Sequence, residues 1–126
     1  MAMNLRFGHN NMPHCIIEYS APLAAQIDIN ELTQSVHQGA LASELFEPSA
    51  VKSRAYASQS CQVGLLADGS FIHITLKIMP GRTDEQKKHL TQMVYRQISE
   101  LTLGVSSLTM EVLELDSAHY FKRLSQ

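Results

Sequence analysis

The sequence lacks any uninterrupted apolar run long enough to cross a membrane. Such a helix needs about 18 apolar residues in succession, whereas the strongest run, residues 71–79, contains His73, Thr75 and Lys77. Residues 1–11 also lack the apolar stretch of a secretory signal and the Arg-rich pattern of an organelle presequence. We therefore expect a soluble, cytoplasmic protein with no membrane partner.

Cysteine is scarce, and neither sign of charge dominates. Cys15 and Cys61 form no C-x-x-C pair and have no clustered histidines beside them. We predict that both are reduced and behave as small strand hydrophobes, and we expect no metal site and no cofactor.

Ten Lys and Arg residues, scattered along the chain, are balanced by twelve Asp and Glu residues, which gives a net charge of -2. This balance excludes a general nucleic-acid binder.

What is present fits one domain with a hydrophobic core. The chain has 126 residues, of which 44% are hydrophobic and 17% charged, so disorder and a disulfide-stapled miniprotein are both excluded. The β-rich segment 13–19 predicts a short first strand that ends at Ser20-Ala21-Pro22.

Two segments carry the signals of amphipathic helices. Residues 28–45 begin with Asp28 and Glu31 in a capping arrangement, continue with apolar residues three to five positions apart, and meet Glu47-Pro48 at the end. Thr83 to Gln86 forms a capping box before a second apolar stripe, and Gly104 suits the end of that helix.

Three further segments alternate as strands do. Residues 51–58 place small residues on one face and both Lys52 and Arg54 on the other. Residues 70–79 follow the Asp68-Gly69 turn and gather four aliphatic side chains on one face, and residues 108–112 alternate in the same way. Each strand therefore has an apolar face that must be covered.

The order of these elements predicts an α/β (α+β) fold made of two βαβ repeats. Right-handed crossovers place two helices on one face of a four-stranded sheet and leave the other face bare. Another subunit must cover that bare face, so we expect a site between subunits.

The segment Met12-Pro13-His14-Cys15-Ile16-Ile17-Glu18-Tyr19-Ser20 resembles the start of the 5-carboxymethyl-2-hydroxymuconate Δ-isomerases of the tautomerase superfamily. Those enzymes begin with Pro-His-Phe-Ile-Val-Glu after methionine removal. The similarity continues through residues 52–54, 71–78, Gly81-Arg82 and 111–122, and covers essentially all of residues 13–126. It implies a homotrimer that moves a double bond in a hydroxymuconate during homoprotocatechuate breakdown. The bare sheet face likewise predicts a trimer, and we expect residues 120–124 to contact the neighbouring subunit.

The resemblance also implies the site residues. A free amino-terminal Pro13 is the expected acid and base, because burial and nearby cations keep the pKa of a secondary amine near the working pH. The implied substrate is a small anion with several carboxylates, for which Arg82 is the first candidate ligand, followed by Arg54 and Lys52. Family members have Arg-Ser-Arg where this chain has Lys52-Ser53-Arg54, and this departure bears on the substrate.

Three histidines are expected to be structural or at the surface, because none has a nucleophile or carboxylate at a spacing typical of a triad or metal site. They are His14, His73 and His89.

Pro13 is not the first residue of this sequence, and a proline nitrogen inside a peptide bond has no basicity. Either translation starts at Met12, so that residues 1–12 are an extension from a misassigned start or the expressed form, or the extension is genuine and the chemistry is lost. We favour Met12 as the start, with residues 13–126 as a single domain.

Two other functions fit the same pattern of elements. One is a non-enzymatic module that binds small ligands or regulates another protein, since ferredoxin-like domains share this order. The other is a tautomerase that acts on a different small unsaturated acid. Pro13 after a methionine and the Arg82 block favour the enzyme.

Overall fold

The computed structural model describes residues 12–125 of the chain. Four strands form one mixed sheet in the order β2-β1-β3-β4. The strands are β1 (His14–Ser20), β2 (Lys52–Ser58), β3 (Phe71–Ile78) and β4 (Ser107–Glu114). β1 runs parallel to β2 and antiparallel to β3, and β3 runs parallel to β4. Each half is thus one βαβ unit, and the two halves meet at the central pair β1 and β3.

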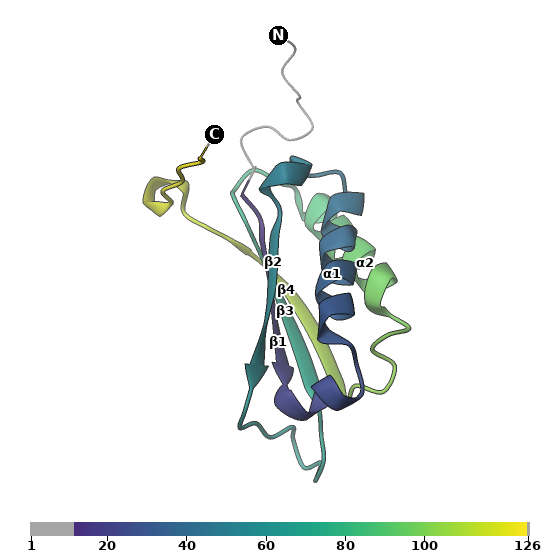
Figure 1. Ribbon diagram of the computed structural model, residues 1–126. Helices are drawn as coiled ribbons and strands as arrows, with labels where there is room; N and C mark the ends of the chain where they lie inside the picture. Colours follow the sequence, from purple (N-terminus) through teal and green to yellow (C-terminus); the bar gives the residue numbers. More distant parts are fainter. Residues whose placement is uncertain (1–11, 126) are drawn as a thin grey trace.

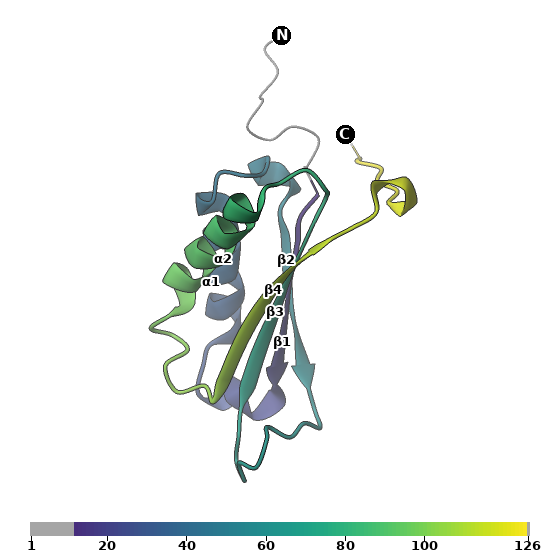
Figure 2. The ribbon, with the colours of Figure 1, turned by 180° about the vertical axis from the view of Figure 1, so that it is seen from behind.

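Both helices, α1 (Ile29–Ala42) and α2 (Asp84–Ile98), cover the same face of the sheet (Figure 1). The view from behind shows the opposite face without a helix (Figure 2). The expected fold class is confirmed. Three short 3₁₀ turns complete the described chain: η1 (Ala21–Ala25), η2 (Pro48–Ala50) and η3 (Ser117–His119).

The core lies between the sheet and the helices. The four aliphatic residues of β3 that the alternation placed on one face are each at most 1% exposed: Ile72, Ile74, Leu76 and Ile78. Cys15 belongs to the same core, as predicted, whereas Cys61 is exposed. The expectation for Cys61 was wrong because this residue lies beyond the end of β2, in the loop to β3.

The helix starts follow their capping residues, but neither predicted end holds. α2 ends at Ile98, six residues before Gly104, because residues 99–104 form turns instead of helix. The Asp28 carboxylate accepts the N–H groups of Asn30 and Glu31 at 2.9 and 3.2 Å, and the capping box at Thr83 is formed. α1 ends at Ala42, not at residue 45, because Glu44 takes a left-handed conformation with φ of 59° that turns the chain away. Leu45 is still buried, so its apolar character marked the core and not the helix.

The antiparallel pairing of β1 and β3 decides what gathers at each end of the sheet. The start of β1 lies beside the start of β2 and the end of β3. β4 ends there too, and the segment that follows it leaves the sheet on the side away from the helices (Figure 1 and Figure 2). Among the helices of residues 12–125, none has both the length and the apolar character to cross a membrane.

Candidate active site

Pro13 stands immediately before β1, at the end of the sheet where β1 and β2 both begin. Its side chain is fully buried, and its carbonyl accepts the backbone N–H of Lys52 at 3.1 Å. Met12, the preceding residue, is 1% exposed. In the full chain the Pro13 nitrogen is therefore a buried tertiary amide, without a proton-accepting lone pair.

The face of the sheet without helices carries the polar residues of the candidate site. Strand register places His14 between Lys52 of β2 and Lys77 of β3, and Ile16 beside Arg54. Ser53, between the two cations of β2, points to the helix side, where its hydroxyl lies 2.7 Å from His37 Nδ1. The prediction that Lys52 and Arg54 share a face is confirmed.

His14 connects these strands to the C-terminal segment. Arg54 Nη1 lies 3.0 Å from His14 Nδ1, and the Tyr120 hydroxyl lies 3.0 Å from His14 Nε2. Sequence reasoning assigned His14 a structural or surface role and so missed this arrangement. Its position next to Pro13 was the one signal that could have placed it in the site.

Positive charge is concentrated around this histidine. Burial lowers the pKa of Lys52, and the neighbouring Lys122 and Arg54 lower it further. Burial also lowers the pKa of His14, with contributions from Arg54, Lys52 and Lys77. Mutual repulsion among these groups is relieved when an anion binds between them. We call Lys52, Arg54, Lys77 and Lys122 the cationic group.

Arg82 lies at the same end of the sheet but is held differently. It follows β3 and precedes the Thr83 cap of α2, as predicted. Its Nη2 donates to the Leu45 carbonyl, and its guanidinium lies 5.8 Å from the centre of the Phe46 ring. Burial lowers the pKa of Arg82, yet a guanidinium keeps its charge in proteins. The fold therefore joins Pro13 to Lys52 and Arg54 and anchors Arg82 on the connection from α1 to β2.

His73 makes a separate polar contact further along the open face. Its Nδ1 lies 2.6 Å from Thr109 Oγ1, and its Nε2 lies 2.6 Å from Glu111 Oε2. These partners belong to β4 and come close only through the pairing of β3 with β4. The contact is a surface hydrogen-bond network between β3 and β4. Within residues 12–125, His, Cys, Asp and Glu side chains form no group of three that could hold a metal ion.

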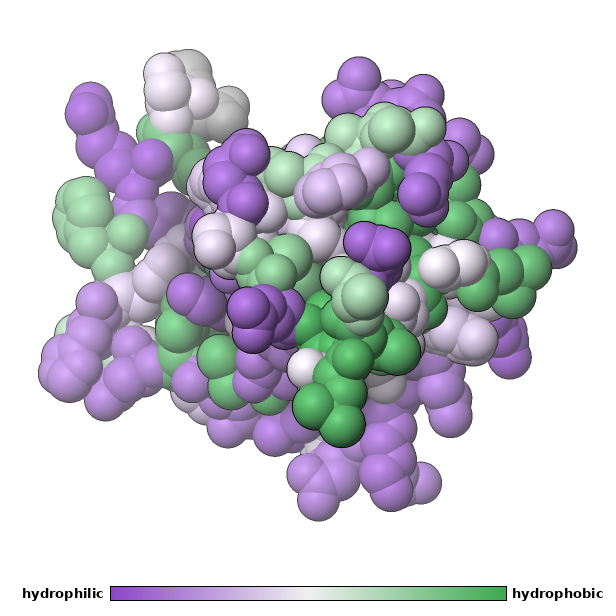
Figure 3. All heavy atoms as spheres, turned by 90° about the horizontal axis from the view of Figure 1, so that it is seen from below, coloured by the Kyte–Doolittle hydropathy of each residue, from purple (hydrophilic) through white to green (hydrophobic). Residues whose placement is uncertain are grey.

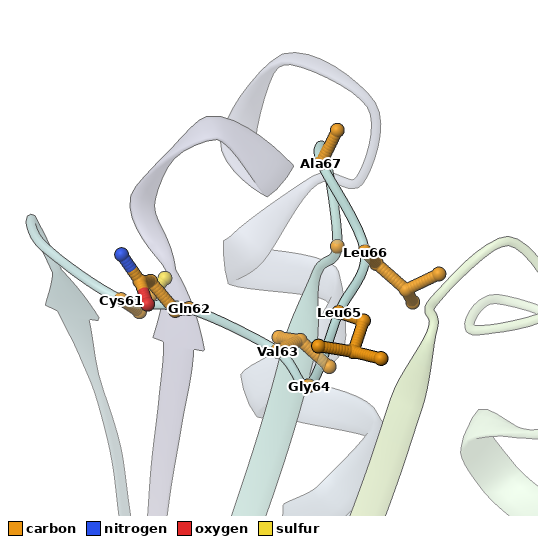
Figure 4. A pocket seen from close by; sticks show the side chains of 8 residues that line it. Cys61, Gln62, Val63, Gly64, Leu65, Leu66 and Ala67 are labelled. Atoms are coloured by element: carbon orange, nitrogen blue, oxygen red, sulfur yellow. The ribbon is translucent and has the colours of Figure 1, made fainter.

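The opposite end of the sheet carries the loop between β2 and β3, which exposes apolar side chains. There the loop between β2 and β3 encloses a cavity of about 280 Å³, lined by Cys61 and its neighbours (Figure 4). Leu65 and Leu66 of this loop are largely exposed, and apolar side chains gather on this end in the view from below (Figure 3). Pro13, Lys52 and Arg54 lie at the other end of the sheet, where β1 and β2 begin.

The comparisons with a protein family and with a known relative give the same family name. The sequence profile of the family described as 5-carboxymethyl-2-hydroxymuconate isomerase matches residues 13–124. The 5-carboxymethyl-2-hydroxymuconate Delta-isomerase of Escherichia coli is 27% identical over 121 residues, which cover 89% of this chain and 94% of that protein.

Solved structures agree with the sequence comparison. A 5-carboxymethyl-2-hydroxymuconate delta-isomerase superposes with a TM-score of 0.79 at 17% identity, covering 97% of this chain and 93% of the other. A 5-carboxymethyl-2-hydroxymuconate isomerase from Deinococcus radiodurans R1 gives a TM-score of 0.75 at 25% identity, with coverages of 97% and 95%. A fused 4-OT protein, solved as an asymmetric trimer, gives a TM-score of 0.63 at 18% identity, with coverages of 86% and 91%. The chain thus shares the tautomerase-like fold.

Proposed function

The chain belongs to the 5-carboxymethyl-2-hydroxymuconate isomerase family, and from this premise we propose that it shifts a double bond in 5-carboxymethyl-2-hydroxymuconate or a related anionic dienol. It is an isomerase with a tautomerase-like fold. The observation that carries the finer proposal is the position of Pro13, the first residue of the family match, beside the cationic group. We expect the reaction to take place in the cytoplasm, in the breakdown of aromatic compounds.

Pro13 is the proposed acid and base. A chain that begins at Pro13 has a secondary amine with a rigid ring at this position. Its burial and the nearby cations disfavour the ammonium form, which lowers the pKa of the amine toward neutrality. The amine takes the proton from the enol hydroxyl of the dienol, and the resulting ammonium returns a proton to a carbon of the conjugated system, so that one O–H bond breaks and one C–H bond forms. Atoms and charge balance, and no cofactor is required.

The cationic group is the proposed anion site. Substrate carboxylates and the enolate oxygen that develops during the reaction both gain from fixed positive charge in a partly buried place. Arg54 offers a planar fork of donors, whereas Lys52 offers a single point charge. Because family members have arginine at the position of Lys52, a dienol whose carboxylates are spaced differently is the alternative substrate.

Arg82 completes the proposed site from the side of the connection between α1 and β2. It is anchored to the Leu45 carbonyl and the Phe46 ring, which keeps its orientation fixed. A preorganised guanidinium stabilises developing negative charge without the cost of reorganising around it.

We further propose that the active form is a homotrimer. The open face of the sheet has no helix to cover it (Figure 2), and the C-terminal segment exposes Phe121 and Leu124 at 86% and 65%. Apolar surface of this kind typically marks a contact between chains. The segment 120–124 is the part expected to reach the neighbouring subunit.

The test compares forms of the chain that differ only at the amino terminus. A protein starting at Pro13 should isomerise 2-hydroxymuconate-type dienols, with a limb of the pH profile set by the imino group. The full 126-residue chain should be nearly inactive, because its Pro13 nitrogen is acylated.

A third form, starting at Asn11, separates two effects of the extension. It keeps Pro13 acylated but removes the first ten residues, so it should be as inactive as the full chain if the amide bond is the cause. Activity restored in the Asn11 form would instead show that residues 1–10 obstruct the site, and also that Pro13 is not the base, because its nitrogen is still acylated in that form. Equal activity in a full chain whose intact mass is verified would remove Pro13 as the base. The mass of the natively expressed protein shows which form the cell makes.

A further inference from the structure

His14 links two parts of the site that are far apart in the sequence. Its Nδ1 lies 3.0 Å from Arg54 Nη1 on β2. Its Nε2 lies 3.0 Å from the hydroxyl of Tyr120, a residue of the segment that follows β4. The two rings also meet edge to face, with centroids 6.2 Å apart. One imidazole therefore contacts a strand cation and the C-terminal segment at the same time.

The partners of His14 determine which of its nitrogens carries the proton. A guanidinium has five N–H donors and no acceptor, so His14 Nδ1 must present its lone pair to Arg54. The single proton of the neutral ring then resides on Nε2, which donates it to the Tyr120 oxygen. In a doubly protonated ring the Nδ1–H would point at the N–H of Arg54, so two donors would face each other and the hydrogen bond would be lost.

The surroundings favour the same neutral form. Lys52 and Lys77 flank His14 on the two neighbouring strands. Burial lowers the pKa of His14 below its ordinary value of 6.5, and Arg54, Lys52 and Lys77 lower it further. Within residues 12–125, the groups that face the ring are Arg54, Lys52 and Lys77 of β2 and β3 and the Tyr120 phenol. At neutral pH the acceptor on Nδ1 is preserved.

We propose that His14 is a positioning residue of the isomerase site. Its hydrogen bond from Arg54 holds that guanidinium toward the substrate carboxylate, and its hydrogen bond to Tyr120 anchors the ring. That Arg54 receives a substrate anion rests on the proposed function, whereas the contacts of His14 with Arg54 and Tyr120 do not depend on it. Nη1 of the Arg54 guanidinium is hydrogen-bonded to His14, and the remaining N–H donors can bind a carboxylate. Without His14, Arg54 keeps its charge but loses its fixed direction, so substrate binding weakens more than proton transfer does.

Two substitutions separate the two hydrogen bonds. In His14→Asn the amide oxygen lies near the former Nδ1, so the acceptor for Arg54 is kept and the reach to Tyr120 is lost. In His14→Gln the amide nitrogen lies near the former Nε2, so the contact with Tyr120 is kept and the acceptor for Arg54 is lost. Tyr120→Phe removes the hydroxyl alone. His89→Asn, at an exposed position of α2, is the control.

The first measurement is ¹⁵N NMR of the histidines in the full chain, assigned with His14→Gln. We expect an unprotonated Nδ1 and a protonated Nε2 in His14 at pH 7.5. We also expect His14 to be harder to protonate in Tyr120→Phe, because the Tyr120 oxygen that accepts from Nε2–H stabilises the charged ring more than the neutral one. A His14 that carries its proton on Nδ1, or that is charged at pH 7.5, would overturn the proposal.

The second measurement is steady-state kinetics in whichever form of the chain turns over an anionic dienol. The His14→Gln variant should raise KM about tenfold, the factor expected for one lost hydrogen bond to a charged group, with kcat changed far less. His14→Asn should retain most of the substrate binding, and His89→Asn should match the parent. Equal losses in the Asn and Gln variants would mean that His14 has only a structural role. If no form is active, the proposed function fails and the NMR result alone decides the placement of His14.

Discussion

At the scale of single residues, the two cysteines show how position sets reactivity. Cys15 is 1% exposed, and burial raises the pKa of its thiol to about 11. The thiolate, which is the reactive species, is therefore almost absent at pH 8. Cys61 is exposed in the loop between β2 and β3. We predict that a disulfide reagent such as DTNB labels one thiol in the folded protein and both after unfolding. Cys61→Ser should abolish the fast reaction, and persistent labelling of that variant would contradict the burial of Cys15.

Arg82 and Lys88 offer a second comparison, between a cation of the proposed site and a cation of the surface. Arg82 is anchored beside Leu45 and Phe46, whereas Lys88 is exposed on α2. Arg82→Ala should reduce kcat/KM by an amount that corresponds to roughly 2–4 kcal/mol, by analogy with lost oxyanion donors. Lys88→Ala should leave turnover unchanged. Equal rates in the two variants would take Arg82 out of the site, and thermal unfolding curves would show whether a loss of folded protein explains any difference.

At the scale of elements, the closest approach of α1 and α2 depends on Gly39. A β-carbon added there would lie 2.5 Å from Val94 Cα and 2.9 Å from the Met93 carbonyl oxygen, both backbone atoms of α2. Gly39→Ala should therefore destabilise the fold by about 1–3 kcal/mol through overpacking, although alanine is the better helix former. Gly104→Ala, where no heavy atom lies within 4 Å, is the matched control. Denaturant unfolding measures both, and a Gly39→Ala protein as stable as the parent would show that the two helices can separate at little cost.

At the scale of the whole molecule, the uncovered face of the sheet predicts association. Light scattering at micromolar concentration should give the mass of three chains. Phe121→Glu should favour the monomer, because the exposed ring lies in the segment expected to meet a neighbour. Leu103→Glu, which changes an equally exposed residue beyond α2, should leave the assembly intact. A parent chain that remains monomeric under these conditions would contradict the proposed trimer and any site shared between subunits.

The sequence predicted much of the local structure because the signals involved are local. Asp28 and the Thr83 capping box determine where the helices begin by satisfying backbone N–H groups a few residues away. The end of α1 was not predictable from the apolar stripe, since Leu45 is buried without being helical. The left-handed turn at Glu44 decides that boundary, and glutamate gives no sign of it in the sequence.

Local spacing in the sequence predicted the alternation of strands and helices, the apolar face of β3, the shared face of Lys52 and Arg54, and the blocks that identify the family. Each depends on spacing within one element, where side-chain direction follows from the helical or strand period. The three-dimensional fold was needed to show that β1 lies antiparallel to β3, which brings the starts of β1 and β2 and the ends of β3 and β4 to one end of the sheet. It alone placed Tyr120 on His14, across 106 positions of sequence. Contacts between such distant residues arise from packing of the whole chain, so no local pattern encodes them.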